Sequence, residues 1–230
     1  MKYLIVNADD FGASVGINRA VAELSDLGVL TSTSLMITMP GAIDAWRYAR
    51  HRPQLGVGLH VTLTDEAANP LVSFDDSKRC RDAIEAQIDV FSMWFGRMPT
   101  HLDAHQNVHR DARLQPVFEE VAGCYDLPLR EHSPVRYFSR FYGQWDSEPH
   151  PEHIGIDSLL QMLDVELHDG ITELSCHPGY VSDDFESPYN AEREIELRTL
   201  SDPRLREFFH ANGIELINFG GVHEDRRIAT

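Results

Sequence analysis

The chain has 230 residues, and its 42% hydrophobic and 25% charged residues are typical of a globular protein long enough to bury a core. Its formal net charge of −17 argues against binding to nucleic acid or anionic membranes, because their phosphate groups would repel it. No apolar run approaches the ~18 residues that a membrane-spanning helix needs. The short run at residues 3–6 ends in acidic residues, unlike a signal peptide, and the three cysteines form no C-x-x-C pair. We therefore expect a cytoplasmic protein that consists of a single domain over residues 1–230.

Apolar runs of strand length alternate with segments of helical periodicity along the chain. Strands are expected at residues 3–6, 31–38, 55–63, 100–105, 127–130, 171–176 and 214–219. Helices are expected at residues 14–27, from 40 onward, and at 77–95, 111–124, 156–168, 191–200 and 203–211. Ser14 has a side chain suited to cap the first of these helices. Residues 64–76 are expected to form a loop, and residues 133–155, which mix Pro with aromatic and polar side chains, a lid or irregular insertion.

The alternation of strands and helices predicts an α/β fold with a mostly parallel sheet. With about seven strands, a closed or nearly closed (β/α) barrel is favoured over an open doubly wound sheet, which stays the alternative. No G-x-G-x-x-G motif follows the first strand, so a dinucleotide-binding fold is excluded. In a parallel barrel the carboxyl ends of all strands share one face, where active sites form.

Four expected strands end in polar residues that a structural strand does not require; they read YLIVNADDFG, GVGLHVTL, THLDAHQNVH and ELSCHPGY. Each has an ordinary explanation when it is taken alone. Paired aspartates after a strand usually form a turn or a helix cap, and a lone histidine such as His60 is usually a hydrogen-bonded core residue. The spacing of His101, His105 and His109 fits a solvated helix face, and a histidine before proline, as at His177, can simply end a strand.

The joint pattern favours a shared metal site over independent coincidences. The adjacent carboxylates of Asp9 and Asp10 repel each other at close range, and a bound cation relieves that repulsion. Neutral imidazoles together with a carboxylate suit Zn²⁺ and similar divalent ions. One aspartate and two histidines, with a position left open for water, match a hydrolytic metal site, and the second aspartate can act as a base toward that water.

The sequence resembles the YdjC-like carbohydrate deacetylases, whose best-described members are chitooligosaccharide deacetylases. The resemblance runs in order through NADDFG (7–12), TSTSLM (31–36), GLHVTLT (58–64), PTHLDAHQNVH (99–109) and SCHPGY (175–180). It implies a distorted (β/α) barrel of about seven mostly parallel strands, like that of the polysaccharide deacetylases.

The resemblance also implies a role for the residues that match its motifs. Asp10, His60 and His105 are expected to bind one divalent metal ion, Mg²⁺ or Zn²⁺, with Mn²⁺ and Co²⁺ as alternatives. Asp9 is expected to be the general base, and His177 the general acid or a group on the oxyanion side. Four further residues are expected to support the metal ligands or to contact substrate. They come from the motifs and from the segment 133–155, and they are Asp103, Asn107, His109 and Tyr142.

One motif departs from the family pattern. Family members commonly read HLDSHHHVH where this chain reads HLDAHQNVH, so Gln106 and Asn107 replace two histidines. The expected metal ligands are retained, and a change in substrate preference is expected if the missing imidazoles contact sugar.

The expected reaction is hydrolysis of the N-acetyl group of an amino sugar or N-acetylated oligosaccharide, with release of acetate. A small carbohydrate is the expected partner, and a homodimer is compatible with the sequence. Packing is the ordinary explanation for any single aromatic residue of the irregular segment, but those that could stack on sugar are Tyr137, Phe138, Phe141, Tyr142 and Trp145. Two alternatives stay open. One is a metal-dependent phosphoesterase or other amidohydrolase on a similar barrel, with Asp103 and His101 or His109 holding a second metal; the other is a non-catalytic sugar-binding relative.

Overall fold

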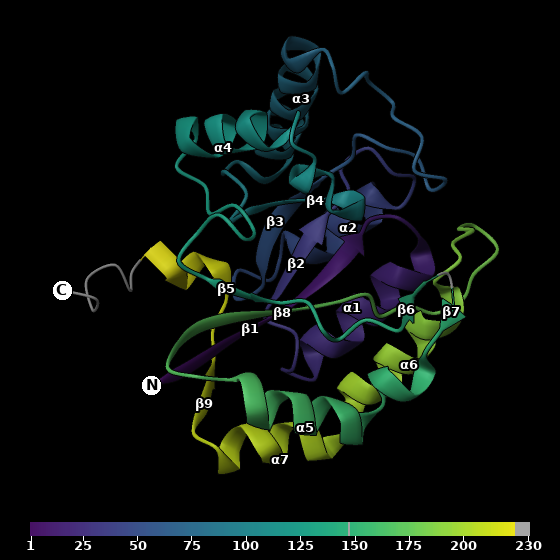
Figure 1. The fold of residues 1–230 in the computed structure, drawn as a ribbon, viewed down its shortest axis with the longest axis vertical. Coiled ribbons are helices and arrows are strands. Elements are labelled where there is room, and N and C mark those ends of the chain that lie inside the picture. The colour runs from purple at the N-terminus through teal and green to yellow at the C-terminus, as the bar shows by residue number, and fades with distance from the viewer. Residues whose placement is uncertain (147, 224–230) are drawn as a thin grey trace.

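The structure is a computed structural model that describes residues 1–146 and 148–223. A seven-stranded sheet forms its centre, with the order β4-β3-β2-β1-β8-β5 and with β9 beside β1. Its strands are β1 (Lys2–Phe11), β2 (Ser32–Leu35), β3 (Gly56–Val61), β4 (Leu102–Ala104), β5 (Arg136–Phe138), β8 (Gly170–Cys176) and β9 (Ile214–Leu216). All of these strands pair in parallel. The mostly parallel, curled sheet confirms the expected α/β class and distorted barrel (Figure 1).

Helices surround the sheet, with α3 and α4 on one side of the molecule and α5 and α7 on the opposite side (Figure 1). The helices are α1 (Val15–Asp26), α2 (Ala42–Ala49), α3 (Ser77–Phe95), α4 (Gln115–Cys124), α5 (Ile156–Glu166), α6 (Asn190–Ser201) and α7 (Pro203–Ala211). The expected cap of α1 is confirmed, because the Ser14 side chain accepts a hydrogen bond from the backbone N–H of Ile17. The helix expected at 77–95 is confirmed as α3, which Asp76 caps and Gly96 ends with a positive φ of 65°.

The residues of β1 alternate between the two faces of the curled sheet. Those that face the inside of the barrel become polar toward the carboxyl end of the strand. Leu4 packs into the large core beneath the helices, whereas Ile5 faces the other way, into a small cluster with Phe219. Two residues further along, Asn7 donates a hydrogen bond from Nδ2 to Asp9 Oδ1 at 2.9 Å. The barrel interior is therefore apolar at the start of β1 and carries hydrogen-bonded polar groups at its end, which is where the site lies.

The prediction of a strand at 127–130 is wrong. Leu129 makes a single parallel bridge to Leu102 of β4. Glu131 then takes a positive φ of 65°, which turns the chain away before a ladder can form. The segment adds backbone to the outer edge of β4 without becoming a strand of its own.

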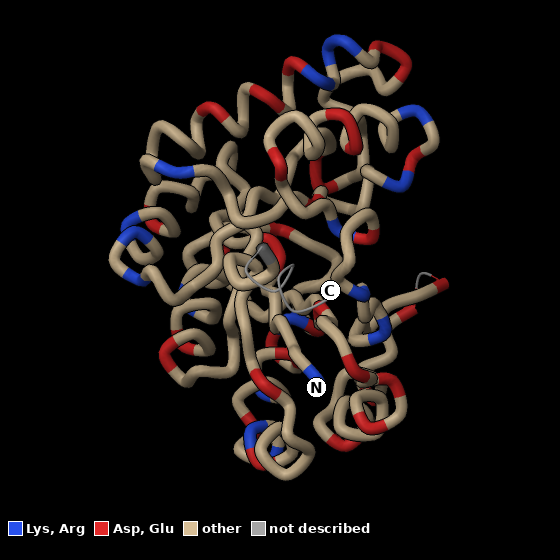
Figure 2. The backbone as a smooth tube through the Cα atoms, turned by 90° about the vertical axis from the view of Figure 1, so that its left-hand side faces the viewer, with Lys and Arg blue, Asp and Glu red and all other residues tan. Residues whose placement is uncertain are grey.

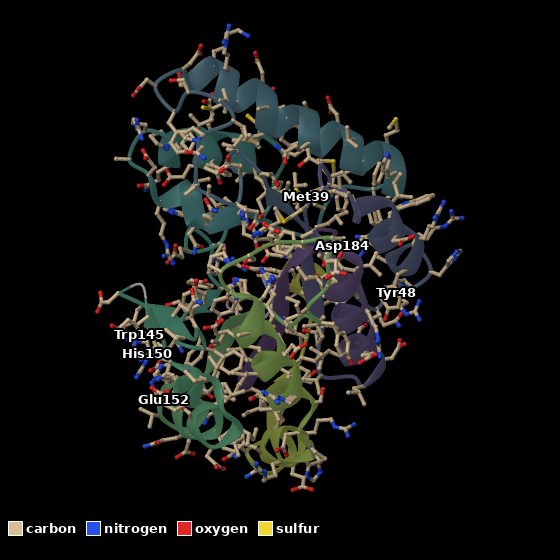
Figure 3. The ribbon with its side chains drawn as sticks, turned by 90° about the vertical axis from the view of Figure 1, so that its right-hand side faces the viewer. Met39, Tyr48, Trp145, His150, Glu152 and Asp184 are labelled. Carbon is tan, nitrogen blue, oxygen red and sulfur yellow. The ribbon has the colours of Figure 1, made fainter. Side chains whose placement is uncertain are left out.

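The segment 133–155 is more regular than an irregular insertion. It contributes β5 to the main sheet, an antiparallel pair of β6 (Gln144–Trp145) and β7 (Glu148–Pro149), and a 3-10 helix η2 (Pro151–Ile154). The Trp145 ring stacks on the His150 ring with a centroid distance of 3.6 Å, and Figure 3 shows both on the outside of the molecule beside Glu152.

Several elements are shorter than the sequence predicts. The strands expected at 31–38 and 55–63 lose residues at their ends, because pairing between neighbouring strands stops earlier. The helix expected at 111–124 begins only at Gln115, because Asp111 has extended backbone with φ −63° and ψ 127°.

Charge is distributed differently on the outside and the inside. In the view of Figure 2, Asp and Glu are spread over the outer segments, with Lys and Arg interspersed among them. None of the helices among residues 1–146 and 148–223 is long and apolar enough to cross a membrane. Buried charged side chains gather instead around the carboxyl ends of β1, β4 and β8 and on α6; they include Asp9, Asp10, Asp103, Arg130, Glu173, Arg193 and Glu196.

Candidate functional site

The carboxyl end of β1 brings two adjacent carboxylates to one place. Asp10 has a positive φ of 64°, and the register with β2 shifts between Ala8 and Phe11, which marks a β-bulge. The bulge interrupts the alternation of side chains, so Asp9 and Asp10 both line a cavity of about 480 Å³ instead of pointing to opposite faces. A positive φ at a non-glycine residue costs about 1–3 kcal/mol and persists only where the surrounding structure fixes it.

Asp10, His60 and His105 bring one carboxylate and two imidazoles together on the wall of this cavity. Asp10 Oδ1 lies 3.3 Å from His60 Nε2 and 3.3 Å from His105 Nδ1. Ligand atoms of the three side chains all lie within 4.8 Å of one another, and all three side chains are buried. A donor set of this kind and spacing can hold a divalent ion and leave a position open for water.

A second group of possible ligands, Asp9, His60 and Asp103, shares His60 with the first. Arg130 donates to both oxygens of Asp9, at 2.7 and 2.8 Å, and its Nη2 lies 2.8 Å from Asp103 Oδ2. Asp10 in the first group also contacts a guanidinium, that of Arg193, but only through Oδ2, so its Oδ1 stays directed at the two imidazoles. Asp103 also stands outside the residues that line the cavity. The first group is therefore the better candidate for a metal site.

Asp103 of β4 orients His60 from the side away from Asp10. Its Oδ1 accepts a hydrogen bond from His60 Nδ1 at 2.7 Å, which leaves Nε2 facing Asp10. Its Oδ2 accepts a hydrogen bond from Ser34 Oγ at 2.6 Å. Burial lowers the pKa of His60, but Asp103 and Asp10 outweigh burial and raise that pKa to about 10. A carboxylate on the far ring nitrogen fixes which nitrogen an imidazole can offer to a metal.

Arg130 is a buried cation that the sequence analysis did not identify. Its Nη1 and Nη2 donate to the two carboxylate oxygens of Asp9 at 2.7 and 2.8 Å. Its Nη2 and Nε donate to Glu173 Oε1 at 2.6 and 3.0 Å. Burial raises the pKa of Glu173 to about 7, and the Arg130 contacts only partly oppose that rise. The available signal was a charged residue at the end of an apolar run, LPLR, as at the other strand ends.

His177 directly follows β8, and its ring faces Asp9. Its Nε2 lies 3.7 Å from Asp9 Oδ2, and its backbone N–H donates to Glu196 Oε2 at 2.5 Å. Glu196, on α6, also accepts a hydrogen bond from the Tyr189 hydroxyl at 2.6 Å. Burial lowers the pKa of His177 and raises that of Glu196 to about 8. The imidazole therefore reaches the same cavity as the aspartates, with a buried carboxylate behind it that the sequence analysis did not identify.

Arg193 is a second buried arginine that the sequence analysis did not identify. It lies one turn before Glu196 on α6, where its Nη2 donates to Asp10 Oδ2 at 2.6 Å and its Nη1 to the carbonyl oxygen of His177 at 3.4 Å. Burial raises the pKa of Asp10, but Arg193 and the two neighbouring imidazoles outweigh burial and hold it well below its ordinary value. The signal for this residue was weak, because the run EREIELR on α6 is typical of a solvated helix face.

The remaining residues predicted for the site separate into those that line the cavity and those that do not. Asn107 and Tyr142 line it, and the Tyr142 ring stacks on Tyr189 with a centroid distance of 4.6 Å. His109 is buried outside it, with Nε2 3.1 Å from Glu131 Oε2.

His101 also lies outside the cavity. Its Nε2 lies 3.0 Å from Ser34 Oγ, and its ring stacks on Phe219 with a centroid distance of 3.8 Å. These contacts give His101 a packing role, so the structure offers little support for a second metal held by Asp103 and His101. Among the aromatic residues considered for sugar stacking, Tyr137, Phe141 and Tyr142 line the cavity, whereas Phe138 and Trp145 do not.

Comparisons with known proteins identify the family and the fold of this chain. The family model for YdjC-like proteins matches residues 3–211. The carbohydrate deacetylase of Thermoanaerobacter pseudethanolicus is 34% identical in an alignment of 248 positions, gaps included, that covers 95% of this chain and 98% of that protein. Among solved structures, a candidate cellobiose-phosphate cleavage protein of Enterococcus faecalis aligns with a TM-score of 0.83 and 27% identity, over 96% of this chain and 98% of the other. A family 4 carbohydrate esterase of Streptomyces lividans, solved with acetate, shares the fold with a TM-score of 0.58 and 14% identity, over 94% and 91% of the two chains.

Proposed function

The chain belongs to the YdjC-like protein family, and from this membership and the geometry of the site we propose that it is a metal-dependent carbohydrate deacetylase. The proposed reaction hydrolyses the N-acetyl group of an amino sugar or N-acetylated oligosaccharide to a free amine and acetate. One observation carries the proposal: Asp10, His60 and His105 converge in the same cavity as Asp9 and His177.

Asp10, His60 and His105 hold the divalent ion in this proposal. The two imidazoles favour Zn²⁺ and similar transition-metal ions such as Co²⁺, and the carboxylate also suits Mg²⁺ and Mn²⁺, so all four ions are candidates. When bound, such an ion supplies a Lewis acid that polarises the acetyl carbonyl and lowers the pKa of water beside it.

Asp9 takes the proton of the attacking water. Arg130 engages both oxygens of its carboxylate, which fixes the carboxylate in one orientation. A positioned base of this kind contributes about 10²–10⁴-fold to the rate. His177, whose Nε2 is 3.7 Å from Asp9 Oδ2, lies on the same wall of the cavity and donates a proton to the departing amine nitrogen. Glu196 holds the backbone of His177 in place.

The cavity suits a sugar-sized ligand. Its volume of about 480 Å³ falls in the range of roughly 300–1,000 Å³ that small-molecule sites occupy. Tyr137 and Tyr142 present aromatic surface on which an apolar sugar face can stack, while Asn107 and Arg110 present polar groups for hydroxyls. This mixture of aromatic and polar lining fits a carbohydrate better than it fits a purely apolar ligand.

The proposal is tested by measuring free acetate. The purified protein is incubated with N-acetylglucosamine and with chitooligosaccharides of defined length, after chelation and after addition of Mg²⁺, Zn²⁺, Mn²⁺ or Co²⁺. We expect the protein to release acetate and free amine in equal amounts. Chelation should abolish this release, and addition of at least one of the metal ions should restore it. A parallel assay for phosphate release from p-nitrophenyl phosphate covers the rival phosphoesterase, and phosphate without acetate would contradict the proposal.

The metal site has a matched control within the same motif. His60→Ala and His105→Ala each remove one of three proposed ligands, so elemental analysis should find little metal in either variant. His109→Ala removes a buried imidazole that does not line the cavity, and its metal content should stay close to that of the wild type. Full metal occupancy in His60→Ala would show that the ion binds elsewhere.

A further inference from the structure

The two imidazoles proposed as metal ligands each meet a carboxylate on the ring nitrogen that faces away from Asp10. For His60 that carboxylate is Asp103, 2.7 Å from Nδ1. For His105 it is Glu66, whose Oε1 lies 3.2 Å from Nε2, while Nδ1 of the same ring lies 3.3 Å from Asp10. Glu66 lines the cavity, and the proposed reaction gives it no role.

His105 Nε2 is a buried atom in need of a hydrogen-bond partner. Among the residues that the structure describes, none forms an aligned hydrogen bond with it. A buried polar group left without a partner destabilises the folded protein, because it has lost its hydrogen bonds to water. Glu66 Oε1 lies 3.2 Å from this atom, and the Glu66 side chain is 29% exposed. A small rotation of that side chain can therefore align the carboxylate with an N–H at His105 Nε2. An N–H at Nε2 leaves the lone pair at Nδ1, on the side of Asp10.

A compact turn carries Glu66 to this position. Asp65 Oδ1 accepts a hydrogen bond from the backbone N–H of Asn69 at 2.8 Å, and the Asp65 backbone N–H donates to the Asn69 carbonyl at 3.0 Å. Gln106 Nε2 donates to the Asp65 carbonyl oxygen at 3.0 Å. Because Gln106 directly follows His105 in the chain, this bond ties the turn that carries Glu66 to the imidazole that Glu66 meets.

We propose that Glu66 is a positioning residue that accepts the Nε2–H of His105 and thereby directs Nδ1 of that ring toward the metal, with Gln106 holding the turn in place. The inference rests on the proposed metal site of Asp10, His60 and His105. Each imidazole ligand then has a carboxylate of its own, and the two rings use opposite nitrogens, Nε2 of His60 and Nδ1 of His105. Gln106 then has a structural task of its own, because it holds the turn that carries Glu66.

Metal affinity gives the first test. Calorimetric titration of the metal-free protein with Zn²⁺ should show affinity about 10-fold lower in Glu66→Ala than in the wild type, because outer carboxylates of this kind support metal binding by about 10–100-fold. Glu66→Gln should lose less, since its amide oxygen still accepts a hydrogen bond. Glu119→Ala is the matched control: it also removes a carboxylate that contacts a histidine, Nδ1 of His132 at 3.0 Å, but lies away from the cavity.

Gln106→Ala tests whether the turn acts through Glu66. The variant should lower Zn²⁺ affinity in the wild-type background and have little further effect in Glu66→Ala, because the turn then carries no carboxylate to position. Equal effects in both backgrounds would show that Gln106 acts by another route and would overturn its part in the proposal.

Nitrogen NMR of the ¹⁵N-histidine-labelled protein with Zn²⁺ identifies the coordinating atom directly. We expect His105 to carry its proton at Nε2 and the metal at Nδ1, with signals of a mixed or altered state in Glu66→Ala. Coordination through Nε2, or unchanged affinity in Glu66→Ala, overturns the inference while leaving the metal site intact. Loss of binding in Glu66→Ala as complete as in His60→Ala overturns it by making Glu66 a ligand. If the wild type binds no Zn²⁺, the metal site itself fails, and the inference fails with it.

Discussion

Arg193 Nη2 lies 2.6 Å from Asp10 Oδ2, so a fixed guanidinium contacts the carboxylate that is proposed to bind the metal. Both side chains are buried, with 4% and 3% of their surfaces exposed. Asp10 uses its other oxygen, Oδ1, toward His60 and His105. The guanidinium thus neutralises Asp10 in the metal-free protein, and a divalent ion at the same carboxylate would meet its positive charge at close range.

Substitution of Arg193 should therefore change metal affinity and stability in opposite directions. Arg193→Met should bind Zn²⁺ or Mn²⁺ several-fold more tightly, because a competing cation is gone. The metal-free variant should unfold more easily by about 3 kcal/mol, since breaking a buried ion pair leaves a charge without its partner. Calorimetric titration and thermal unfolding measure the two effects. Arg198→Met, an exposed position on the same helix, is the control. Weaker metal binding in Arg193→Met would give Arg193 a supporting role toward the metal.

The imidazoles of the site predict a pH dependence of metal binding. The pKa of His60 is raised to about 10 and that of His105 to about 9, because neighbouring carboxylates outweigh the effect of burial. Both rings are therefore imidazolium ions at neutral pH in the metal-free protein, with a proton on each nitrogen. Coordination requires the neutral ring, so each ligand must lose one proton when the metal binds. Metal affinity should rise with pH up to these values, and binding should release protons. Titrations in buffers of different ionisation enthalpy count the protons released; a count of zero at pH 7 would contradict the raised pKa values.

The raised pKa values of His60 and His105 also determine how the stability of the metal-free protein changes with pH. A raised histidine pKa contributes stability that is fully present below the ordinary value near 6.5 and is lost as the pH rises through the folded-state value. The metal-free protein should therefore lose this contribution as the pH rises from about 6.5 toward 9 and 10. Saturating metal should remove the effect, because the metal replaces the protons. Thermal unfolding measured with and without metal across this range checks both statements.

Much of the fold follows from local signals. The helix at 77–95 has a capping aspartate before it and a glycine after it, so its bounds could be predicted to the residue. β5 could not be predicted in this way, because its three residues form a strand only through pairing with β8. The same holds for Leu129, whose single bridge depends on β4 and on the positive φ of Glu131.

The sequence likewise predicts some residues of the site and not others. The residues placed at the strand ends could be predicted, because parallel strands bring their carboxyl ends to one edge. The charged residues that hold them come from distant segments: Arg130 is 121 residues from Asp9, and Arg193 is 183 residues from Asp10. For Arg130 the local sequence offers only the charged end of the apolar run LPLR. For Arg193 it offers less, since a helix with many charged residues looks the same whether its charges face water or a buried carboxylate.

The adjacent aspartates should separate metal binding from chemistry. Asp10→Asn should lose metal. Asp9→Asn should keep metal but lower kcat by about 10²–10⁴-fold, because it removes the proposed base. Glu173→Gln is the control for disruption of the Arg130 contacts, since Glu173 also bonds Arg130 but does not line the cavity. Metal content and acetate release are measured for all three. Equal loss of metal from both aspartate variants would refute this division of roles.

His177 should govern the decline of the rate at higher pH. Its role as an acid requires the imidazolium form, and burial lowers its pKa below the ordinary value, with Asp9 and Asp10 opposing that shift. An acid with a lowered pKa loses its proton earlier as the pH rises, so kcat/KM should begin to fall below the pH at which a free histidine titrates. Ionisation of water at the metal contributes to the same limb of the profile, so the wild-type curve alone does not assign it.

The assignment therefore rests on a comparison of His177→Gln with the wild type. Glutamine keeps a polar side chain beside Asp9 but cannot carry the proton, so the variant should retain metal, turn over slowly and show a changed alkaline limb. His109→Gln, at a buried histidine outside the cavity, should leave the profile unchanged. Loss of metal from His177→Gln would make this residue a ligand. Wild-type turnover in the variant would leave His177 with the structural task of ending β8 before Pro178, where the missing backbone N–H prevents further pairing.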